Sequence, residues 1–180
     1  MNRGDRVDSI VREWKESRPK LDFSAVEVVA RVLRAAHYLQ TRLDRIAATY
    51  GLSHRGDLEV LTDLYRTRPP YELTPSQLAG ALLLTTGGMT VRLNRLQSAG
   101  LIERHPNPRD GRGVLVRLTT HGVALAEDAL STLLETQASS IGALTPTERH
   151  DLADLLRSLL ASFGDTPTTR PAVAVRRPER

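Results

Sequence analysis

The segment that decides the fold is residues 73–119, which read LTPSQLAGALLLTTGGMTVRLNRLQSAGLIERHPNPRDGRGVLVRLT. Thr74 and Gln77 have the spacing of a capping box with proline at the first helical position, so a short helix is predicted there. A polar turn at 85–88 separates it from a second helix, expected over about residues 87–98. Two short helices joined by a tight polar turn are typical of a helix-turn-helix.

Two short apolar stretches follow, at residues 101–104 and 114–118, and both favour strands. The connector between them is rich in Pro, Asn, Asp and Gly, which predicts a hairpin whose tip is longer than a tight turn requires. A helix-turn-helix followed by such a hairpin is a winged helix-turn-helix.

Helical patterns flank this segment on both sides. Ser24 and Glu27 have the spacing of a capping box, and so do Thr145 and Glu148, so a long helix is expected to begin at each. The expected flanking helices cover about residues 5–17, 24–50, 53–67, 119–139 and 145–163. The predicted fold class is mainly α with a small β-hairpin, a winged helix-turn-helix flanked by helices at both ends.

Composition excludes several classes of protein. The chain has 180 residues, 40% of them hydrophobic and 26% charged, which is typical of a soluble globular protein. It has no cysteine, so disulfides and thiolate chemistry are excluded. It shows no helical histidine pair, phosphate-binding glycine loop or nucleophile–base set, so no metal, cofactor or enzymatic activity is predicted. Without an apolar run long enough for a membrane or an apolar signal core, a cytoplasmic protein is expected.

The charge is concentrated in the winged segment. Residues 90–117 hold six arginines and two acidic residues, and their net charge of +4 equals that of the whole chain. Such clustering is an electrostatic footprint for phosphate. Double-stranded DNA is therefore the predicted partner.

The second helix of the motif is expected to enter the major groove, where the glycine pair lets its backbone approach closely. Asn94 and Arg95 are placed to reach base edges or phosphates, and Val91 to meet a thymine methyl group. The alternative is a solvated polar face with no partner. The residues expected on the core side of this helix are Met89, Leu93 and Leu96.

The hairpin tip carries Arg109 and Arg112, which can enter a narrow minor groove because its negative potential attracts arginine. The alternative is an exposed loop without a partner. The full set of expected DNA-binding residues is Thr85, Thr86, Gly87, Gly88, Thr90, Val91, Asn94, Arg95, Arg109 and Arg112.

The sequence closely resembles the MarR family of bacterial transcription regulators over about residues 24–163. The segments that carry the resemblance are LTPSQL at 73–78, GGMTVRLNRL at 87–96, GLIER at 100–104 and RDGRGVLVRLT at 109–119. The resemblance implies an obligate homodimer whose terminal helices interlock and whose two winged domains read a pseudo-palindrome.

This resemblance gives the expected domain organisation. The Pro-, Thr- and Arg-rich end of the chain has little to bury and is expected to be a disordered tail. The expected parts are an extra N-terminal helix at 1–20, dimerisation helices at 21–50 and 119–164, a winged helix-turn-helix DNA-binding domain at 51–118, and the tail at 165–180.

Within the family, the sequence is similar to the PecS and HucR group, which responds to urate or related purines. The N-terminal helix with Trp14, the Pro-Pro-Tyr71 turn and the Gly-Gly-Met-Thr sequence carry this similarity. It implies the ligand-binding residues Trp14, Glu59, Arg66 and Arg92, with Glu59 standing where the group has aspartate. A carboxylate and a guanidinium two turns apart on one helix can bracket a planar molecule that has both N–H groups and anionic oxygens.

The sequence therefore predicts a ligand-responsive, homodimeric repressor, released from its operator by urate, a related purine or a phenolic acid. Arg92 has a second interpretation, in which it pairs with a carboxylate inside the DNA-binding lobe and a ligand competes for that pair. The alternative function is a ligand-insensitive architectural DNA-binding protein, in which Trp14, Glu59 and Arg66 are structural. An interaction module without salt-dependent DNA affinity is a further alternative.

Overall fold

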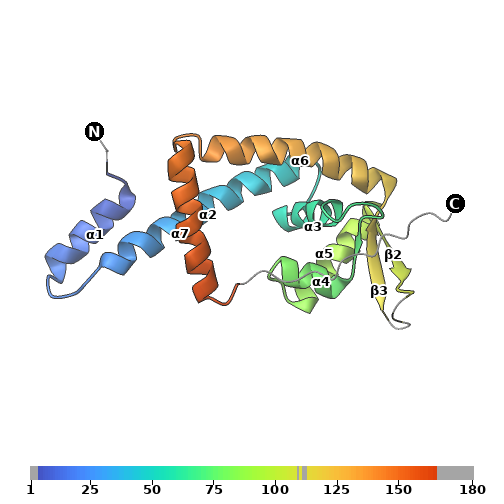
Figure 1. Ribbon diagram of the computed structural model, residues 1–180, viewed down its shortest axis with the longest axis horizontal. Coiled ribbons are helices and arrows are strands. Elements are labelled where there is room, and N and C mark those ends of the chain that lie inside the picture. Colours follow the sequence, from blue (N-terminus) through green and yellow to red (C-terminus); the bar gives the residue numbers. More distant parts are fainter. Residues whose placement is uncertain (1–3, 109, 111–112, 166–180) are drawn as a thin grey trace. The chain divides into compact units, whose positions relative to one another are not determined.

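The computed structural model describes residues 4–108, 110 and 113–165 (Figure 1). The described part is mostly helical and includes a three-stranded sheet, so the predicted fold class is confirmed. The elements are α1 (Arg6–Ser17), α2 (Ser24–Thr49), α3 (Arg55–Tyr65), β1 (Glu72–Leu73), α4 (Pro75–Ala81), α5 (Thr86–Ser98), β2 (Ile102–Pro106), β3 (Val114–Leu118), α6 (Thr120–Ser140) and α7 (Pro146–Ser162). The expected tail lies outside the described residues, apart from Asp165.

The chain divides into two compact units, Met1–Gln137 and Ala138–Arg180. In the second unit, the predicted capping box begins α7. The Glu148 amide donates to Thr145 Oγ1 at 3.3 Å, and the Thr145 amide donates to Glu148 Oε2 at 2.8 Å. The Thr145 amide and hydroxyl both donate to the Glu148 carboxylate, and these two hydrogen bonds lower the pKa of the Glu148 carboxyl.

In the first unit, α4 begins where the sequence predicts, and α5 begins at Thr86, one residue before its predicted start and within the predicted turn. The Gln77 amide donates to Thr74 Oγ1 at 3.2 Å and the Thr74 amide to Gln77 Oε1 at 2.8 Å, which completes the capping box of α4. At the start of α5, Thr85 Oγ1 accepts a hydrogen bond from the Gly88 amide at 3.2 Å. A side-chain cap of this kind stabilises a helix by about 1 kcal/mol.

The core of this unit lies between the winged elements and two long helices. The inner face of α5 is buried as predicted, through Met89, Leu93 and Leu96. It packs in one cluster with buried side chains of α3, α4, the sheet, α2 and α6, which include Leu61, Leu78, Val116, Ile46 and Ala126. The winged lobe is therefore continuous in packing with the C-terminal part of α2 and with α6.

The sheet has the order β1–β3–β2 and is antiparallel throughout. The two strands of the wing were predicted, whereas β1, which is two residues long, was not. Glu72 of β1 lies opposite Arg117 of β3, and their side chains form an ion pair at 2.7 Å. The short strand is thus held to the wing by its side chains as well as its backbone.

The capping box predicted at Ser24 is wrong. The N-cap of α2 is Phe23, and its side chain makes no capping hydrogen bond. Asp22 accepts hydrogen bonds from the Ser24 amide at 2.8 Å and from the Ser24 hydroxyl at 2.9 Å, and these lower the pKa of the Asp22 carboxyl. A carboxylate is the stronger acceptor at the positive end of a helix. Glu27 instead pairs with Lys15 of α1 at 2.9 Å.

Helix α1 packs along the N-terminal half of α2 and lies at the end of α2 that is farthest from α3 (Figure 1). Val7 and Val11 are buried against Phe23 and Ala30. Two aspartates of α1 face one arginine of α2, and the Arg31 guanidinium approaches Asp5 at 2.8 Å and Asp8 at 2.6 Å. The added N-terminal helix is therefore docked on α2 by apolar packing and by ion pairs.

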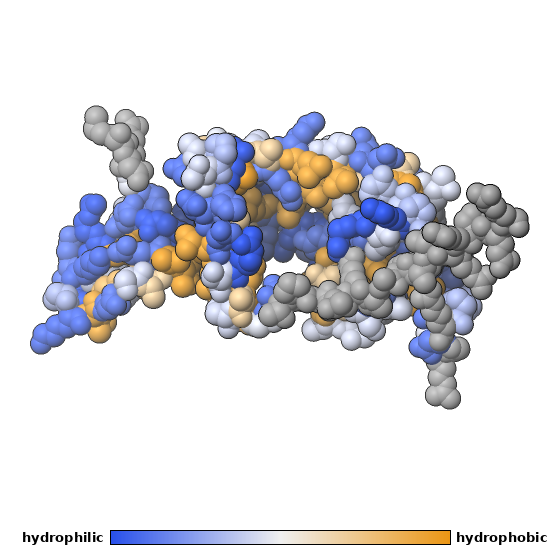
Figure 2. Space-filling model, viewed as in Figure 1, coloured by the Kyte–Doolittle hydropathy of each residue, from blue (hydrophilic) through white to orange (hydrophobic). Residues whose placement is uncertain are grey.

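The predicted apolar face of α2 is largely uncovered in the single chain. Leu33 is 65% exposed, and Val26, Val29 and Leu39 are exposed as well. In the second unit, α7 exposes Leu155 and Phe163, the latter at 76%. Figure 2 shows apolar side chains at the surface of these helices. Exposed apolar stretches of this extent on soluble proteins mark sites of association.

Candidate DNA interface and effector pocket

The outer face of α5 carries a stripe of exposed polar side chains. Thr86, Thr90, Asn94 and Gln97 follow one another at intervals of four, four and three residues and are all exposed. Val91 is 60% exposed on the same side of the helix. A Cβ atom added at Gly87 would meet no atom within 4 Å, so packing within the chain does not require glycine there. The first turn of α5 is open to close approach from outside.

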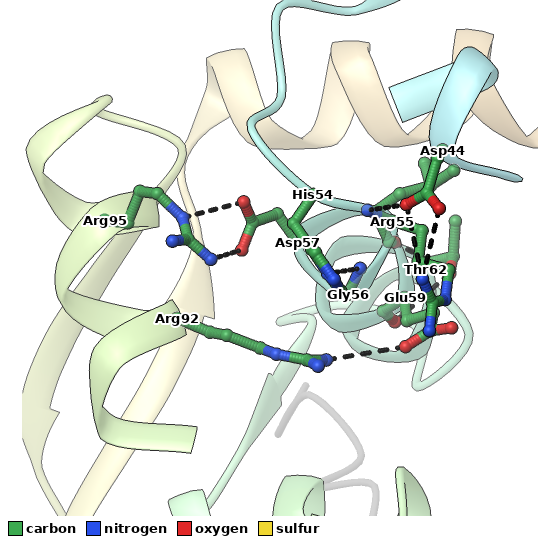
Figure 3. A network of polar contacts seen from close by, with 10 residues as sticks. Asp44, His54, Arg55, Gly56, Asp57, Glu59, Thr62, Arg92 and Arg95 are labelled. Atoms are coloured by element: carbon green, nitrogen blue, oxygen red, sulfur yellow. Dashed lines mark hydrogen bonds and ion pairs between the residues drawn. The ribbon is translucent and has the colours of Figure 1, made fainter. Parts of the chain in front are cut away.

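Arg95 points inward, toward α3, rather than outward. Its Nε and Nη2 atoms donate to the two carboxylate oxygens of Asp57 at 2.8 and 2.7 Å (Figure 3). The hydrogen bond to Asp57 raises the pKa of Arg95, although partial burial opposes the shift. Arg95 was expected to reach base edges or phosphates, and in this structure its guanidinium is engaged within the protein.

Asp57 was not among the residues singled out from the sequence. It lies on the same helical face as Leu61 and Leu64, at spacings of four and seven, and all three are buried. A carboxylate on an apolar face needs a partner, because an unpaired buried charge is costly. That pattern is the signal that could have indicated a facing arginine.

Asn94 is likewise engaged with another part of the protein. Arg104 of β2 extends across the outer face of α5 and donates from Nη2 to Asn94 Oδ1 at 2.8 Å. It also donates from Nη1 to Gln97 Oε1 at 2.9 Å. The C-terminal half of the polar stripe is therefore joined to the base of the wing.

The tip of the wing lies partly outside the described residues. Arg109 and Arg112 are both among the residues that the structure does not describe. The described part forms a turn in which the Asn107 amide donates to the Gly113 carbonyl at 2.9 Å. The Asp110 amide donates to the Asn107 carbonyl at 3.1 Å. The hairpin predicted from the Pro, Asn, Asp and Gly content is present up to this point.

A cavity of about 480 Å³ lies between α3, the end of α4 and α6. Its polar lining comes from α3 and its immediate C-terminal end, and leucines of α4 and α6 form its apolar wall. The lining residues are Glu59, Thr62, Asp63, Tyr65, Arg66, Leu82, Leu130 and Leu133. Two of the four predicted ligand residues, Glu59 and Arg66, therefore share one cavity. Arg66 forms an ion pair there with the nearly buried Asp63.

Arg92 connects this cavity to α5. Its Nη1 atom lies 3.4 Å from Glu59 Oε2, so it pairs with a carboxylate of the DNA-binding lobe, as its second interpretation proposed (Figure 3). The guanidinium lies directly over Gly56, where an added Cβ atom would come within 2.0 Å of Nη1. Glycine at position 56 leaves the space through which Arg92 reaches Glu59.

The first turn of α3 is also tied to α2. The Arg55 guanidinium pairs with Asp44 at 3.1 Å, and His54 Nδ1 accepts a hydrogen bond from the Gly56 amide at 2.9 Å (Figure 3). One helical turn thus carries contacts to both α2 and α5. Movement of α3 would be transmitted to both helices.

Trp14 is not brought to this cavity within one chain. It stacks on Phe23 with ring centroids 6.0 Å apart, beside the start of α2. The cavity is lined by α3, whose first residue, Arg55, pairs with Asp44 of α2. Asp44 lies about 30 Å along α2 from Phe23, at 1.5 Å per residue. Three of the four predicted ligand residues are assembled by the single chain, and the fourth is not.

Two further observations concern the described residues alone. In that part of the chain, no three histidine, aspartate or glutamate side chains are grouped so that they could hold a metal ion. None of the helices traced there is both long enough and apolar enough to cross a membrane.

The fold and the geometry of this site agree with the comparisons with known proteins. Residues 50–113 match the model of the MarR family. The HTH-type transcriptional regulator PecS of Dickeya dadantii is 32% identical over 150 residues, which cover 83% of this chain and 90% of PecS. The chain belongs to the MarR family of transcription regulators. Membership confirms the prediction of a regulator that is not an enzyme.

Solved structures of the family are similar to this one. A mutant MarR of Escherichia coli, complexed with operator DNA, is 31% identical and aligns with a TM-score of 0.62 over 77% of this chain and 97% of that chain. AbsC of Streptomyces coelicolor aligns with a TM-score of 0.73 at 20% identity, over 81% of this chain and 98% of that chain. The second likeness concerns the fold alone.

Proposed function

We propose that this protein is a cytoplasmic, nucleoid-associated, homodimeric repressor that binds a pseudo-palindromic operator and is released by a small aromatic anion. The observation that carries the proposal is the position of Glu59. Glu59 lines the cavity, and its carboxylate also pairs with Arg92 of α5 at 3.4 Å. A ligand that engages Glu59 therefore competes directly for a contact that ties α5 to α3.

The open first turn of α5 and the basic winged segment support DNA binding. The residues proposed to meet DNA from α5 are Thr85, Thr86, Gly87, Gly88, Thr90 and Val91, and Arg95 orients the helix through Asp57. Arg109 and Arg112 keep their proposed place in the minor groove. The E. coli relative in complex with operator DNA gives further support.

The uncovered apolar faces of α2 and α7 support a homodimer. A second copy of the chain supplies a self-complementary surface through two-fold symmetry. The segments 21–50 and 119–164 are the proposed dimerisation helices. Within one chain, about 30 Å of α2 lies between Trp14 and the cavity. In the proposed dimer, the Trp14 that contributes to a cavity therefore belongs to the second subunit.

The chemistry of the cavity favours a flat molecule with two kinds of edge. Arg66 suits anionic oxygens, Glu59 suits N–H donors, and the leucine wall suits an apolar ring face. Arg92 does not line the cavity but pairs with Glu59, which does. Urate, related purines and phenolic acids have these properties in part or in full. Recognition helices must lie about 34 Å apart to meet successive major grooves, so a displacement of a few Å weakens operator binding.

The test is a fluorescence anisotropy titration of the promoter fragment beside the protein's own gene, at two salt concentrations, with and without urate. Specific, salt-sensitive binding that urate weakens is expected. Arg66→Gln is the matched variant, and it should retain DNA affinity while losing the response to urate. Absence of specific binding would overturn the proposal. Binding that neither urate, xanthine nor phenolic acids release would favour the ligand-insensitive DNA-binding protein.

A further inference from the structure

Arg104 lies between the wing and α5, the second helix of the helix-turn-helix. It stands on β2, the first strand of the wing, and its guanidinium lies on the exposed stripe of α5. Side chains alternate along a strand, so the neighbouring Glu103 points to the other face, where its carboxylate lies 2.7 Å from His105 Nε2. The position of Arg104 is therefore set by α5 rather than by its neighbours in sequence.

The two groups that hold Arg104 are both neutral. They are the amide oxygens of Asn94 and Gln97, at 2.8 and 2.9 Å. By contrast, the arginines Arg92, Arg95 and Arg117 in the same region each face a carboxylate. Among the residues that the structure describes, no carboxylate forms an ion pair with Arg104, so its charge is oriented there without being neutralised. Its guanidinium also keeps N–H donors beyond the two that the amides use, since guanidinium has five.

We propose that Arg104 is a phosphate-binding residue of the DNA interface and that Asn94 and Gln97 are the residues that position it. The assignment rests on the proposed function, in which α5 enters a major groove and the wing enters the next minor groove. One sugar–phosphate backbone separates two adjacent grooves. A cationic side chain fixed between α5 and the base of the wing faces that backbone, and a guanidinium matches phosphate with two parallel donors.

The assignment changes the role of Asn94. The side chain that was expected to reach base edges or phosphates instead orients an arginine, so sequence reading by α5 is confined to the part of the stripe near Thr86, Thr90 and Val91. Phosphate contacts fix register and orientation but carry no base information. Asn94 and Gln97 should therefore affect affinity for all DNA sequences to a similar extent.

The test compares wild type with Arg104→Gln in anisotropy titrations of the promoter fragment over a series of salt concentrations. The variant should bind about tenfold more weakly, as expected for one charge-assisted hydrogen-bond contact. The slope of log affinity against log salt should fall by about 0.9. Arg12→Gln on the exposed side of α1 is the matched control, because it makes the same charge change away from α5.

Two outcomes separate this assignment from the proposed function. If wild type binds the promoter specifically and Arg104→Gln has the same affinity and salt slope, or Arg12→Gln loses as much, the assignment is wrong and the proposed function stands. If wild type shows no specific binding, the proposed function and the assignment both fail. Arg104→Lys is the control for misfolding. It keeps the positive charge but lacks the two parallel N–H donors of a guanidinium, so it should retain the salt slope while binding more weakly.

The positioning role is tested with Asn94→Ala on a set of operators that each carry one base-pair substitution. Affinity should fall by a similar factor on every operator and should fall no further in the Arg104→Gln background, since the two residues act as one unit. Relaxed discrimination at a single base pair, with additive effects of the two substitutions, would overturn the role and make Asn94 a base reader.

Discussion

Arg95 and Asp57 form a two-pronged ion pair that joins the last turn of α5 to the first turn of α3. The two hydrogen bonds measure 2.8 and 2.7 Å, and the Asp57 side chain is only 1% exposed whereas that of Arg95 is 39% exposed. Two parallel bonds fix direction as well as distance. The orientation of α5 relative to α3 therefore depends on a carboxylate that is almost completely buried.

Replacing Asp57 by Asn should destabilise the protein by about 2 kcal/mol. Breaking a fully buried pair costs about 3–5 kcal/mol, and the cost is lower here because Arg95 can turn toward water. The measurement is the urea denaturation midpoint at one fixed protein concentration. Asp154→Asn, in the exposed Asp154–Arg157 pair of α7, is the matched control and should change stability by less than about 0.5 kcal/mol. Equal effects of the two substitutions would contradict the structural role of Asp57.

The docking of α1 should weaken in acid. Hydrogen bonding from Arg31 lowers the pKa of the Asp5 carboxyl below its usual value of about 4. A lowered folded-state pKa contributes stability that is present above the unfolded value and is lost as the pH falls through the folded one. Trp14 is the only tryptophan and stacks on Phe23, so its fluorescence reports the position of α1.

The corresponding measurement is an acid titration of tryptophan emission from pH 6 to pH 2.5. Wild type should change only below pH 4. Arg31→Gln removes the partner, so its transition should shift to higher pH. Identical titration curves for the two proteins would show that the ion pairs with Arg31 do not stabilise the docking of α1.

Gly56→Ala should break the ion pair between Arg92 of α5 and Glu59 of the cavity without unfolding the protein. The added Cβ atom would overlap the far end of the Arg92 side chain, which is flexible and can move away. DNA affinity should fall severalfold without ligand, because the pair with Glu59 contributes up to about 1 kcal/mol. Urate should then have little further effect. Anisotropy titrations with and without urate check this, and an undiminished urate response would contradict it.

Gly87→Ala should lower DNA affinity without lowering the stability of the protein. No atom of the residues that the structure describes lies within 4 Å of the added Cβ, and alanine favours a helix over glycine by up to about 1 kcal/mol, so thermal stability should be unchanged or higher. DNA affinity should fall, because a methyl group then stands where the backbone of α5 is proposed to approach the duplex. The midpoint of thermal unfolding and the operator affinity are measured on the same preparation. Unchanged affinity would place the first turn of α5 away from DNA.

The parts of the fold that were predictable from the sequence have local signals. The Thr74 and Thr145 capping boxes and the buried side of α5 each follow from residues within one or two helical turns. The capping box at Ser24 has the same signal and failed, because Asp22 offers a stronger acceptor two residues earlier. The spacing of Ser24 and Glu27 does not take such a competitor into account.

The parts that were missed depend on partners far apart in sequence. Arg95 and Asp57 are 38 residues apart, and Arg104 and Asn94 are 10 apart across two different elements. No periodicity links such residues, so the same arginine could be assigned to DNA or to the protein. Glu59 and Arg66 line one cavity because they share a helix face, whereas Trp14 lies at the far end of α2.

The shared position of Glu59, between the cavity and α5, has a thermodynamic consequence. Under the proposed function, one carboxylate serves two mutually exclusive partners, so ligand and operator oppose each other through a single coupling free energy. Such coupling is reciprocal: the factor by which ligand weakens operator binding is the factor by which operator weakens ligand binding. Protein on its operator is therefore a poorer ligand sensor than free protein, and the ligand concentration needed for release rises with operator occupancy.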